Sequence, residues 1–468
     1  MLLLTWSLKM IRSCLRELTR RNIALALLGV TSTLLSGCGG LGPASKTPPP
    51  DPQLNQSINH IIFLVQENRG FDHYFGHLPD YWAANGYPAV QFDAEPANAS
   101  NPTQDGTGTI TAYHFRTVCM QNMSPGWNES HVEWNRTDPV STTATLDGFV
   151  QEAAHFAQTA TGSDAPAFDL QGFRAMGYYT GDDLNYYYFM ASNFATSDRW
   201  FSPLMSRTQP NRLYLFAATS AGHANPPKTP LSNKTIFEAL ENANISWKIY
   251  LTDPNTAFIG NFQPFGSQHP EKIVPLSEYF QDVANGTLPS VVLIEPGYQS
   301  GLDEHPNKNV QSGSAFVSKE INALMNSPSW KDSVFILTFD EGGSFYDHVP
   351  PQPAVSPDGI PPSDLNLGDI CTVKTGANCD FNHTGYRIPL LVVSPFTKKH
   401  FISHTVADYT AILKLIETRF QIPSLTQRDA AQMDMTEFFD FANPPWMTPP
   451  NPPAQKQDGV CDFLQQTP

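Results

Sequence analysis

A run of apolar residues, 61–65, is followed within two positions by a carboxylate and an amide, Glu67 and Asn68. A strand that is apolar throughout, rather than at alternate positions, is typical of the centre of a parallel sheet covered on both faces. The run at residues 333–339 has a similar character and leads directly into two acids. Ligands of open α/β sheets bind outside the carboxyl ends of such strands, so the sequence predicts chemistry at both points.

The chain has 468 residues, of which 40% are hydrophobic, enough to build a large core. Further buried strands are predicted at residues 291–294 and 389–393, and the apolar positions of residues 406–420 keep a helical period. Strands that alternate with helices predict an α/β fold, namely a doubly wound, mainly parallel sheet sandwiched by helices. The 30 glycines and 41 prolines, with only 15% charged residues, indicate long ordered loop insertions.

Thr208 stands two residues before Pro210, which presets the turn into a helix predicted over residues 213–219. A hydroxyl in this place is a candidate nucleophile. Each of these segments alone has a plainer interpretation, a turn at the end of a strand with solvated acids. For Asp340 and Glu341 the plain alternative is a helix N-cap or a surface turn.

Ordered motifs between about residues 60 and 422 resemble the phosphoesterase family that contains the bacterial nonspecific phospholipases C and the related acid phosphatases, a branch of the alkaline phosphatase-like superfamily. The motifs are Gln66-Glu67-Asn68-Arg69, Phe71-Asp72-His73-Tyr74-Phe75-Gly76, Met176-Gly177-Tyr178-Tyr179, Asp182-Asp183-Leu184, Ser197-Asp198-Arg199-Trp200-Phe201-Ser202, Thr208-Gln209-Pro210-Asn211-Arg212-Leu213, Asp303-Glu304-His305-Pro306, Phe339-Asp340-Glu341-Gly342-Gly343, Tyr346-Asp347-His348-Val349-Pro350-Pro351 and Tyr386-Arg387-Ile388-Pro389. Two positions depart from the family's pattern. Gly70 stands where the family commonly has serine, and Pro125, six residues before His131, stands where it often has histidine.

The resemblance implies a divalent metal ion. In the family's acid phosphatases the matching positions are metal ligands, which implies the same role for Glu67, Asn68, Thr208, Asp340 and Glu341. An all-oxygen ligand set favours a hard cation such as Ca²⁺, Mg²⁺ or Mn²⁺, with zinc as an alternative. Such a cation would lower the pKa of the threonine hydroxyl and neutralise charge on a transferred phosphoryl group.

The resemblance also implies that Thr208 is the nucleophile. A free threonine hydroxyl is scarcely ionised at neutral pH, so it needs a cation or a base. His305 and His131 are candidates to bind phosphoryl oxygens or to protonate the departing alcohol. Asn211 is a candidate donor to a nonbridging phosphoryl oxygen, and Arg212 either does likewise or is a structural ion-pair partner.

A group of aromatic residues has two interpretations. It can form a cage for a quaternary ammonium head group such as choline. Alternatively, it belongs to the hydrophobic core. Its members are Tyr186, Tyr187, Tyr188, Trp127 and Trp134.

Residues 1–37 have the pattern of a bacterial lipoprotein signal, with basic residues up to Arg21, an apolar stretch at 23–35 and Gly37 before Cys38. Cys38 would then be acylated, and the protein would be exported and anchored to the cell envelope, in the periplasm or at the cell surface. The apolar stretch is short for a transmembrane helix. An uncleaved anchor, an ordinary secretory signal and twin-arginine export are alternatives.

The rest of the chain is expected to have three parts. They are a Pro-rich tether over residues 38–58, a phosphoesterase domain over 59–430 and a Pro-rich tail over 431–468. The formal net charge of −16 argues against a nucleic-acid partner, because phosphate backbones favour basic surfaces.

Four cysteines follow Cys38, and an even number in an exported chain indicates disulfides. The close pair Cys371 and Cys379 is predicted to close one loop. This leaves Cys119 to pair with Cys461.

The sequence favours a lipid-anchored, exported, metal-dependent hydrolase of phosphate esters. Within that class, a phospholipase C that cleaves phospholipid diesters through a phosphothreonine intermediate is favoured over an acid phosphatase that acts on small monoesters. A lipoprotein that keeps the fold for binding alone is a more remote alternative. The expected partners are a phospholipid or small phosphate ester substrate and the membrane reached through Cys38.

Overall fold

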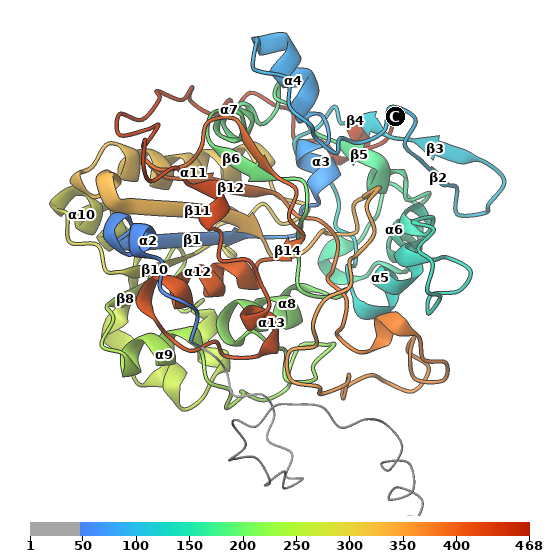
Figure 1. The fold of residues 1–468 in the computed structure, drawn as a ribbon. Coiled ribbons are helices and arrows are strands. Elements are labelled where there is room, and N and C mark those ends of the chain that lie inside the picture. Colours follow the sequence, from blue (N-terminus) through green and yellow to red (C-terminus); the bar gives the residue numbers. More distant parts are fainter. Residues whose placement is uncertain (1–46) are drawn as a thin grey trace, which may run out of the picture. The chain divides into compact units, whose positions relative to one another are not determined.

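An eight-stranded sheet runs through residues 47–468, the part of the chain that the computed structural model describes (Figure 1). The predicted signal, Cys38 and residues 38–46 of the tether lie outside the described residues. From one edge to the other, the strands are β13 (Phe401–Ser403), β6 (Ala195–Ser197), β12 (Leu390–Val393), β11 (Ser333–Phe339), β1 (His60–Gln66), β10 (Val291–Glu295), β8 (Trp247–Leu251) and β9 (Ile273–Pro275).

β1 lies at the centre of this sheet, parallel to β11 on one side and to β10 on the other. Ile61 pairs with Val334 and with Val291. Every residue of β1 after His60 is buried, and so is every residue of β11. The predicted mainly parallel sheet is therefore confirmed. β12 is the exception, since it runs antiparallel to both of its neighbours.

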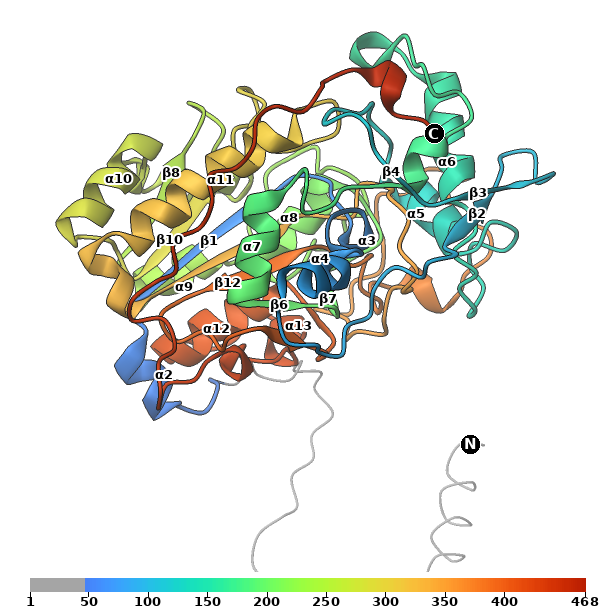
Figure 2. The same ribbon diagram turned by 90° about the horizontal axis from the view of Figure 1, so that it is seen from above.

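Helices cover both faces of the sheet (Figures 1 and 2). On one face lie α7 (Asn185–Asn193) and α11 (Val310–Met325), with α10 (Leu276–Asn285) packed against α11. On the other face lie α8 (Thr208–Ala217), α9 (Ile236–Asn242) and α12 (Thr410–Phe420), and α2 (Pro52–Ser57) contacts α12. None of the described helices has the length and apolar character needed to cross a membrane.

Long insertions lie beyond the carboxyl ends of the central strands, where α5, α6 and the short β2–β3 ribbon gather (Figure 1). The sequence predicted such loops from glycine and proline content. The remaining elements, most of them in these insertions, are α3 (Phe71–Phe75), α4 (Leu78–Asn85), β2 (Ser100–Pro102), β3 (Thr109–Thr111), β4 (Tyr113–His114), α5 (Trp127–Trp134), α6 (Phe149–Thr159), β5 (Gly177–Tyr178), β7 (Trp200–Phe201), β14 (Ala407–Asp408) and α13 (Gln427–Ala430).

Two predicted helices begin elsewhere than expected. α8 starts at Thr208 rather than at residue 213, because Pro210 falls within the first helical turn, where its missing N–H leaves no hydrogen bond unmade. α12 starts at Thr410 rather than at residue 406, since Ala407 and Asp408 pair with β7 instead.

Both predicted disulfides are confirmed. Cys371 and Cys379 are bridged with a Cα separation of 5.7 Å, and Cys119 is bridged to Cys461 at 4.9 Å. The second bridge fixes the end of the Pro-rich tail beside the insertion that carries Cys119. Trp446 of the same tail packs on the sheet layer, so the tail follows the surface of the domain over its length.

Candidate active site

The loop after β1 brings Glu67 and Asn68 to the carboxyl edge of the sheet. The N–H of Glu67 donates to the Asp303 carbonyl at 2.9 Å, and the N–H of Asn68 donates to Asp340 Oδ1 at 2.9 Å. Asn68 has a φ of +54°, in the left-handed region that asparagine adopts more readily than most residues. A β-carbon on Gly343 would lie 2.2 Å from the Asn68 carbonyl oxygen, so only glycine lets the two loops approach this closely.

Thr208 lies at the N-terminal end of α8 and faces the β1 loop. Its Oγ1 lies 3.1 Å from Glu67 Oε2 and 3.4 Å from Asn68 Oδ1. Thr208 is partly exposed, whereas both partners are buried. The hydroxyl therefore forms the accessible side of a buried acidic group, where a substrate can reach it.

Arg212 follows Thr208 by one turn of α8 and is buried among carboxylates. Its Nη2 lies 2.9 Å from Glu67 Oε1, and its Nε lies 3.4 Å from Asp340 Oδ2. Nη2 also donates to the Val65 carbonyl at 2.8 Å. Of the two uses left open by the sequence, the structure shows the ion pair.

Two carboxylate oxygens of this group, Asp340 Oδ2 and Glu341 Oε1, are buried and accept no hydrogen bond, although Asp340 Oδ2 has the ion pair with Arg212 at 3.4 Å. The other oxygens are used, because Asp340 Oδ1 accepts from Asn68 and Glu341 at 2.9 Å each, and Glu341 Oε2 accepts from Gly343 at 2.5 Å. Buried anionic oxygens without a partner are costly unless a cation satisfies them. Contacts thus join Glu67, Asn68, Thr208 and Asp340, and their oxygens are of the type that binds a hard divalent cation. Glu341 follows Asp340 directly, but the carboxylates of Glu67, Asp340 and Glu341 do not offer three oxygens that all lie within 4.8 Å of one another.

Burial raises the pKa of each acid in this group. Burial and then the charge of Glu67 raise the pKa of Asp340 to about 7, against the lowering effect of Arg212. Burial also raises the pKa of Glu67, again opposed by Arg212. Burial and the charge of Asp340 raise the pKa of Glu341 well above its usual range. A cation that binds here must therefore compete with protons.

His305 joins the group through Asn68. Its Nε2 lies 3.2 Å from Asn68 Nδ2, and its Nδ1 lies 2.9 Å from the Pro306 carbonyl. If Nδ1 carries the hydrogen, the neutral ring accepts from the Asn68 amide and turns the amide oxygen towards Thr208. Burial lowers the pKa of His305, which favours this neutral form.

Asp303 also belongs to the group, although sequence reasoning gave it no role. Its carbonyl accepts from Glu67, and its Oδ1 accepts from the N–H of His305 at 3.3 Å. Burial raises the pKa of Asp303 to about 6. Its place two residues before His305 in a matched motif was the one signal that could have identified it.

The structure places His131 away from this group. The ring is fully buried, with Nδ1 2.6 Å from the Trp127 carbonyl and Nε2 3.2 Å from the Asn378 carbonyl. Burial lowers the pKa of His131 to about 4. A neutral ring has one N–H and donates it to only one of these carbonyls. Its full burial in the insertion gives it a structural place, not the contact with substrate that was predicted.

Asn211 also has a different place from the predicted one. Both hydrogens of its amide are used, since Nδ2 donates to the carbonyls of Ser206 at 2.6 Å and Arg207 at 3.3 Å. Its Oδ1 accepts from the N–H of Leu204 at 3.1 Å. Asn211 therefore holds the loop that leads into Thr208, and no donor remains for a phosphoryl oxygen.

Of the two interpretations of the aromatic group, the structure shows the hydrophobic core. The tyrosines at 186–188 are fully buried in the core, and Tyr187 donates its hydroxyl hydrogen to Glu304. The indole N–H groups of Trp127 and Trp134 donate to backbone carbonyls. These rings therefore leave no open cage for a head group.

A second set of potential ligands, Asp72, Asp347 and His348, lies close together. A guanidinium already occupies it, because Arg387 Nε lies 2.9 Å from Asp347 Oδ1 and Nη2 lies 2.8 Å from Asp72 Oδ1. Burial opposes protonation of His348, but the hydrogen bond with Asp72 raises its pKa to about 9. Two cationic side chains thus balance two acids, and the set is an ion-pair network.

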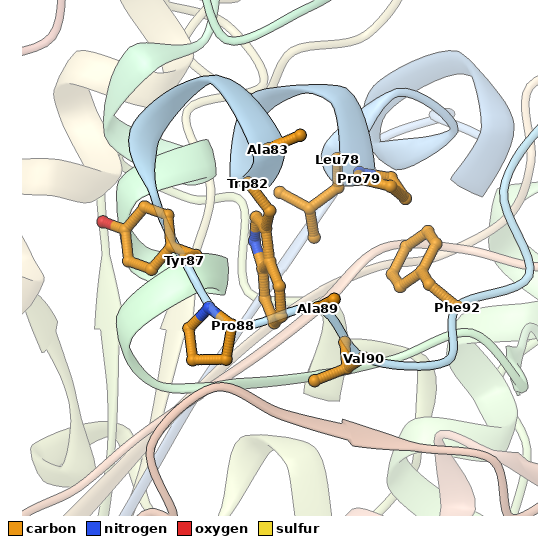
Figure 3. A pocket seen from close by; sticks show the side chains of 9 residues that line it. All are labelled: Leu78, Pro79, Trp82, Ala83, Tyr87, Pro88, Ala89, Val90 and Phe92. Atoms are coloured by element: carbon orange, nitrogen blue, oxygen red, sulfur yellow. The ribbon is translucent and has the colours of Figure 1, made fainter.

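An apolar cavity of about 150 Å³ lies between α4 and the segment that follows it (Figure 3). Leu78, Trp82 and Phe92 line it, and its other lining residues are Pro79, Ala83, Tyr87, Pro88, Ala89 and Val90. None of these carries an acid or a base. The cavity can accept hydrocarbon but has no groups for phosphoryl chemistry.

Comparisons with known proteins identify the family of the chain. Residues 58–423 match the sequence profile described as the Phosphoesterase family. The chain belongs to this family. Phospholipase C B of Mycobacterium tuberculosis is 31% identical over 477 residues, covering 91% of this chain and 84% of that protein. Non-specific phospholipase C5 of Arabidopsis thaliana is 29% identical, covering 80% of this chain and 72% of that protein.

A solved structure also overlaps with this phosphoesterase. It is a protein in the alkaline phosphatase superfamily from Vibrio parahaemolyticus, with 12% sequence identity and a TM-score of 0.31 over 76% of this chain and 78% of that chain. As a member of its family, the protein is a hydrolase of phosphoric esters.

The metal-free phosphoesterase should become more stable as the pH falls from about 8 towards 5. Burial raises the pKa of Asp340 to about 7 in the folded state from its ordinary value of 3.8, so the folded protein takes up a proton that the unfolded chain does not. Asp340→Asn removes this titration, so the free energy of unfolding of the variant should rise less than that of the parent over the same pH range. Thermal unfolding in chelator at several pH values measures both proteins.

Metal affinity should change in the opposite direction and weaken as the pH falls, because protons and the cation compete for the same oxygens. Calorimetric titration with Mn²⁺ or Ca²⁺ at the same pH values measures this. In the unfolding experiment, a stability difference between the parent and Asp340→Asn that stays the same at every pH would contradict the raised pKa of Asp340.

Proposed function

We propose that this phosphoesterase is an exported, metal-dependent hydrolase of the phospholipase C type, in which Thr208 attacks phosphorus. The main support is the position of the Thr208 hydroxyl, 3.1 Å from Glu67 Oε2 at the accessible side of the buried carboxylates. The relatives named phospholipase C support phospholipid diesters as the substrate class.

Residues of the chain account for the activation of the nucleophile. Glu67 Oε2 accepts the hydroxyl hydrogen of Thr208, and it takes up this proton as Thr208 Oγ1 bonds to phosphorus. Arg212 pairs with the other oxygen of Glu67 and so holds the carboxylate in this orientation. A divalent cation held by Glu67, Asn68, Asp340 and Glu341 would lower the hydroxyl pKa and offset charge on the phosphoryl group.

The phosphorus bond to the leaving alcohol breaks in the same step, which leaves the head-group phosphate on Thr208. The departing alcohol, diacylglycerol for a phospholipid, takes up one proton. Water then attacks phosphorus, the bond to Thr208 breaks, and the hydroxyl regains its hydrogen. The alcohol receives the proton that Glu67 took from Thr208, and the attacking water supplies the hydrogen that Thr208 regains. We propose that His305, whose ring contacts Asn68 beside Thr208, relays the first of these protons after its Nε2 has released the Asn68 amide.

An acid phosphatase that acts on small monoesters is the second candidate, since the same nucleophile and acids serve both reactions. Hydrolysis of phosphatidylcholine, p-nitrophenyl phosphorylcholine and p-nitrophenyl phosphate should be compared with chelator and after metal is added back. We expect the two diesters to be hydrolysed faster than the monoester, and all turnover to depend on the added metal. A preference for the monoester would favour the phosphatase, and no turnover of any substrate would favour a binding lipoprotein.

Thr208→Ala should lower turnover by more than about a hundredfold, because it removes the attacking oxygen. Thr208→Ser keeps a hydroxyl in the same place and is the matched control, which should retain measurable turnover. Circular dichroism should show that both variants fold, since a partly exposed hydroxyl contributes little to stability.

In the parent, mass spectrometry of an acid-quenched reaction should find phosphate on the peptide that contains Thr208. Equal turnover of Thr208→Ala and parent would rule the nucleophile out.

We also propose that the protein functions in the cell envelope, anchored through lipid on Cys38. The two disulfides of the described residues support an oxidising compartment outside the cytosol. Mass spectrometry of the mature N-terminus should show an acylated cysteine, and Cys38→Ser should release active protein from the membrane fraction. An unmodified parent protein that is found in the soluble fraction would contradict the anchor.

A further inference from the structure

A small cavity beside Glu341 contains the carboxylate of Glu133, which has no part in the proposed reaction. It has about 10 Å³ of space for the centre of a water-sized sphere, which is room for about one water molecule or one ion. Glu133, on α5, lines this cavity together with Glu341. The two carboxylates come from segments far apart in the sequence, one in an insertion and one at the end of β11.

Glu133 is an unpartnered acid. It is 1% exposed, and neither Oε1 nor Oε2 accepts a hydrogen bond. Oε1 of Glu341 is also buried and accepts no hydrogen bond. Buried carboxylates in native proteins are normally paired, hydrogen-bonded or bound to a metal, so these three oxygens call for a partner.

Four serines line the same cavity, and each hydroxyl donates its hydrogen to a backbone carbonyl. Ser130 donates to Pro125 at 3.0 Å and Ser344 to Ser124 at 2.6 Å. The other two are Ser202 and Ser206, which donate to Tyr386 and Ala224. Because these hydrogens are used, only the lone pairs of the four hydroxyl oxygens are left to interact with the cavity. Lone pairs attract a cation rather than a carboxylate.

Charge in this region is also unbalanced. No lysine, arginine or histidine is among the described residues that line the cavity. Arg212 is the guanidinium that pairs with the neighbouring acids. Arg212 contacts Glu67 and Asp340, so among the described residues no contact with a cationic side chain offsets Glu133 or Glu341.

We propose that the cavity between Glu133 and Glu341 is a second cation site that binds a hard divalent cation of the Mg²⁺, Mn²⁺ or Ca²⁺ class. Glu133 supplies two oxygens, Glu341 supplies Oε1, and the serine hydroxyls supply neutral oxygens. The cation ties α5 to the loop after β11 and fixes the position of Glu341. Because Glu341 is also a ligand in the proposed catalytic group, this inference rests in part on the proposed function.

The test is the number of Mn²⁺ ions bound per chain, measured by elemental analysis after equilibrium dialysis of the complete protein. The parent should bind two, and Glu133→Gln, which keeps the shape but removes the charge, should bind one. Glu320→Gln on α11 is the matched control, because Glu320 is also 1% exposed, has an oxygen without a hydrogen bond and lies outside the cavity lining. It should bind two. Equal Mn²⁺ content in the parent and in Glu133→Gln would overturn the proposal.

Crystals of the parent protein grown with Mn²⁺ avoid any question of whether the variant folds. Anomalous scattering should show one peak among Glu67, Asp340 and Thr208 and a second between Glu133 and Glu341. A single peak at the first position overturns the second site and leaves the proposed function in place. A single peak at the second position supports this inference and contradicts the ligand set of the proposed function.

Discussion

The buried guanidinium of Arg212 is the interaction on which the rest of the site depends. It contacts the carboxylates that follow β1 and β11, and it comes from the helix that carries Thr208. Without this charge the two acids would repel each other in a place where water cannot screen them. One side chain thus links the acids after two paired strands to the helix that carries Thr208.

Several parts of the fold and the site were predictable because a local pattern encodes them. A strand covered on both faces must be apolar at every position, so β1 and β11 were recognisable without their partners. The acids after them were then assigned to the same edge of the sheet. The close cysteine pair at 371 and 379 left a single pairing for the other two, and the structure has both bridges.

What the sequence did not reveal depends on contacts between distant residues. A tyrosine run such as 186–188 looks alike in a core and in an open cage, and only burial decides between them. The unpaired oxygens of Glu133 could not be predicted either, since no residue near Glu133 in the sequence indicates which acid it faces in the fold. Asn211 was misjudged because its motif suggested contact with substrate, whereas its amide is fully used by the loop beside it.

The central position of β1 has a consequence for when the enzyme becomes active. β1 is the earliest strand of the sheet in the chain, yet its two neighbours begin at residues 291 and 333. The middle of the sheet therefore cannot form until about three-quarters of the polypeptide is available, and such non-local pairing is slow. For the proposed export, this delay separates synthesis from catalysis. If the chain crosses the membrane unfolded, the acids that would act on phospholipids remain apart until it has crossed.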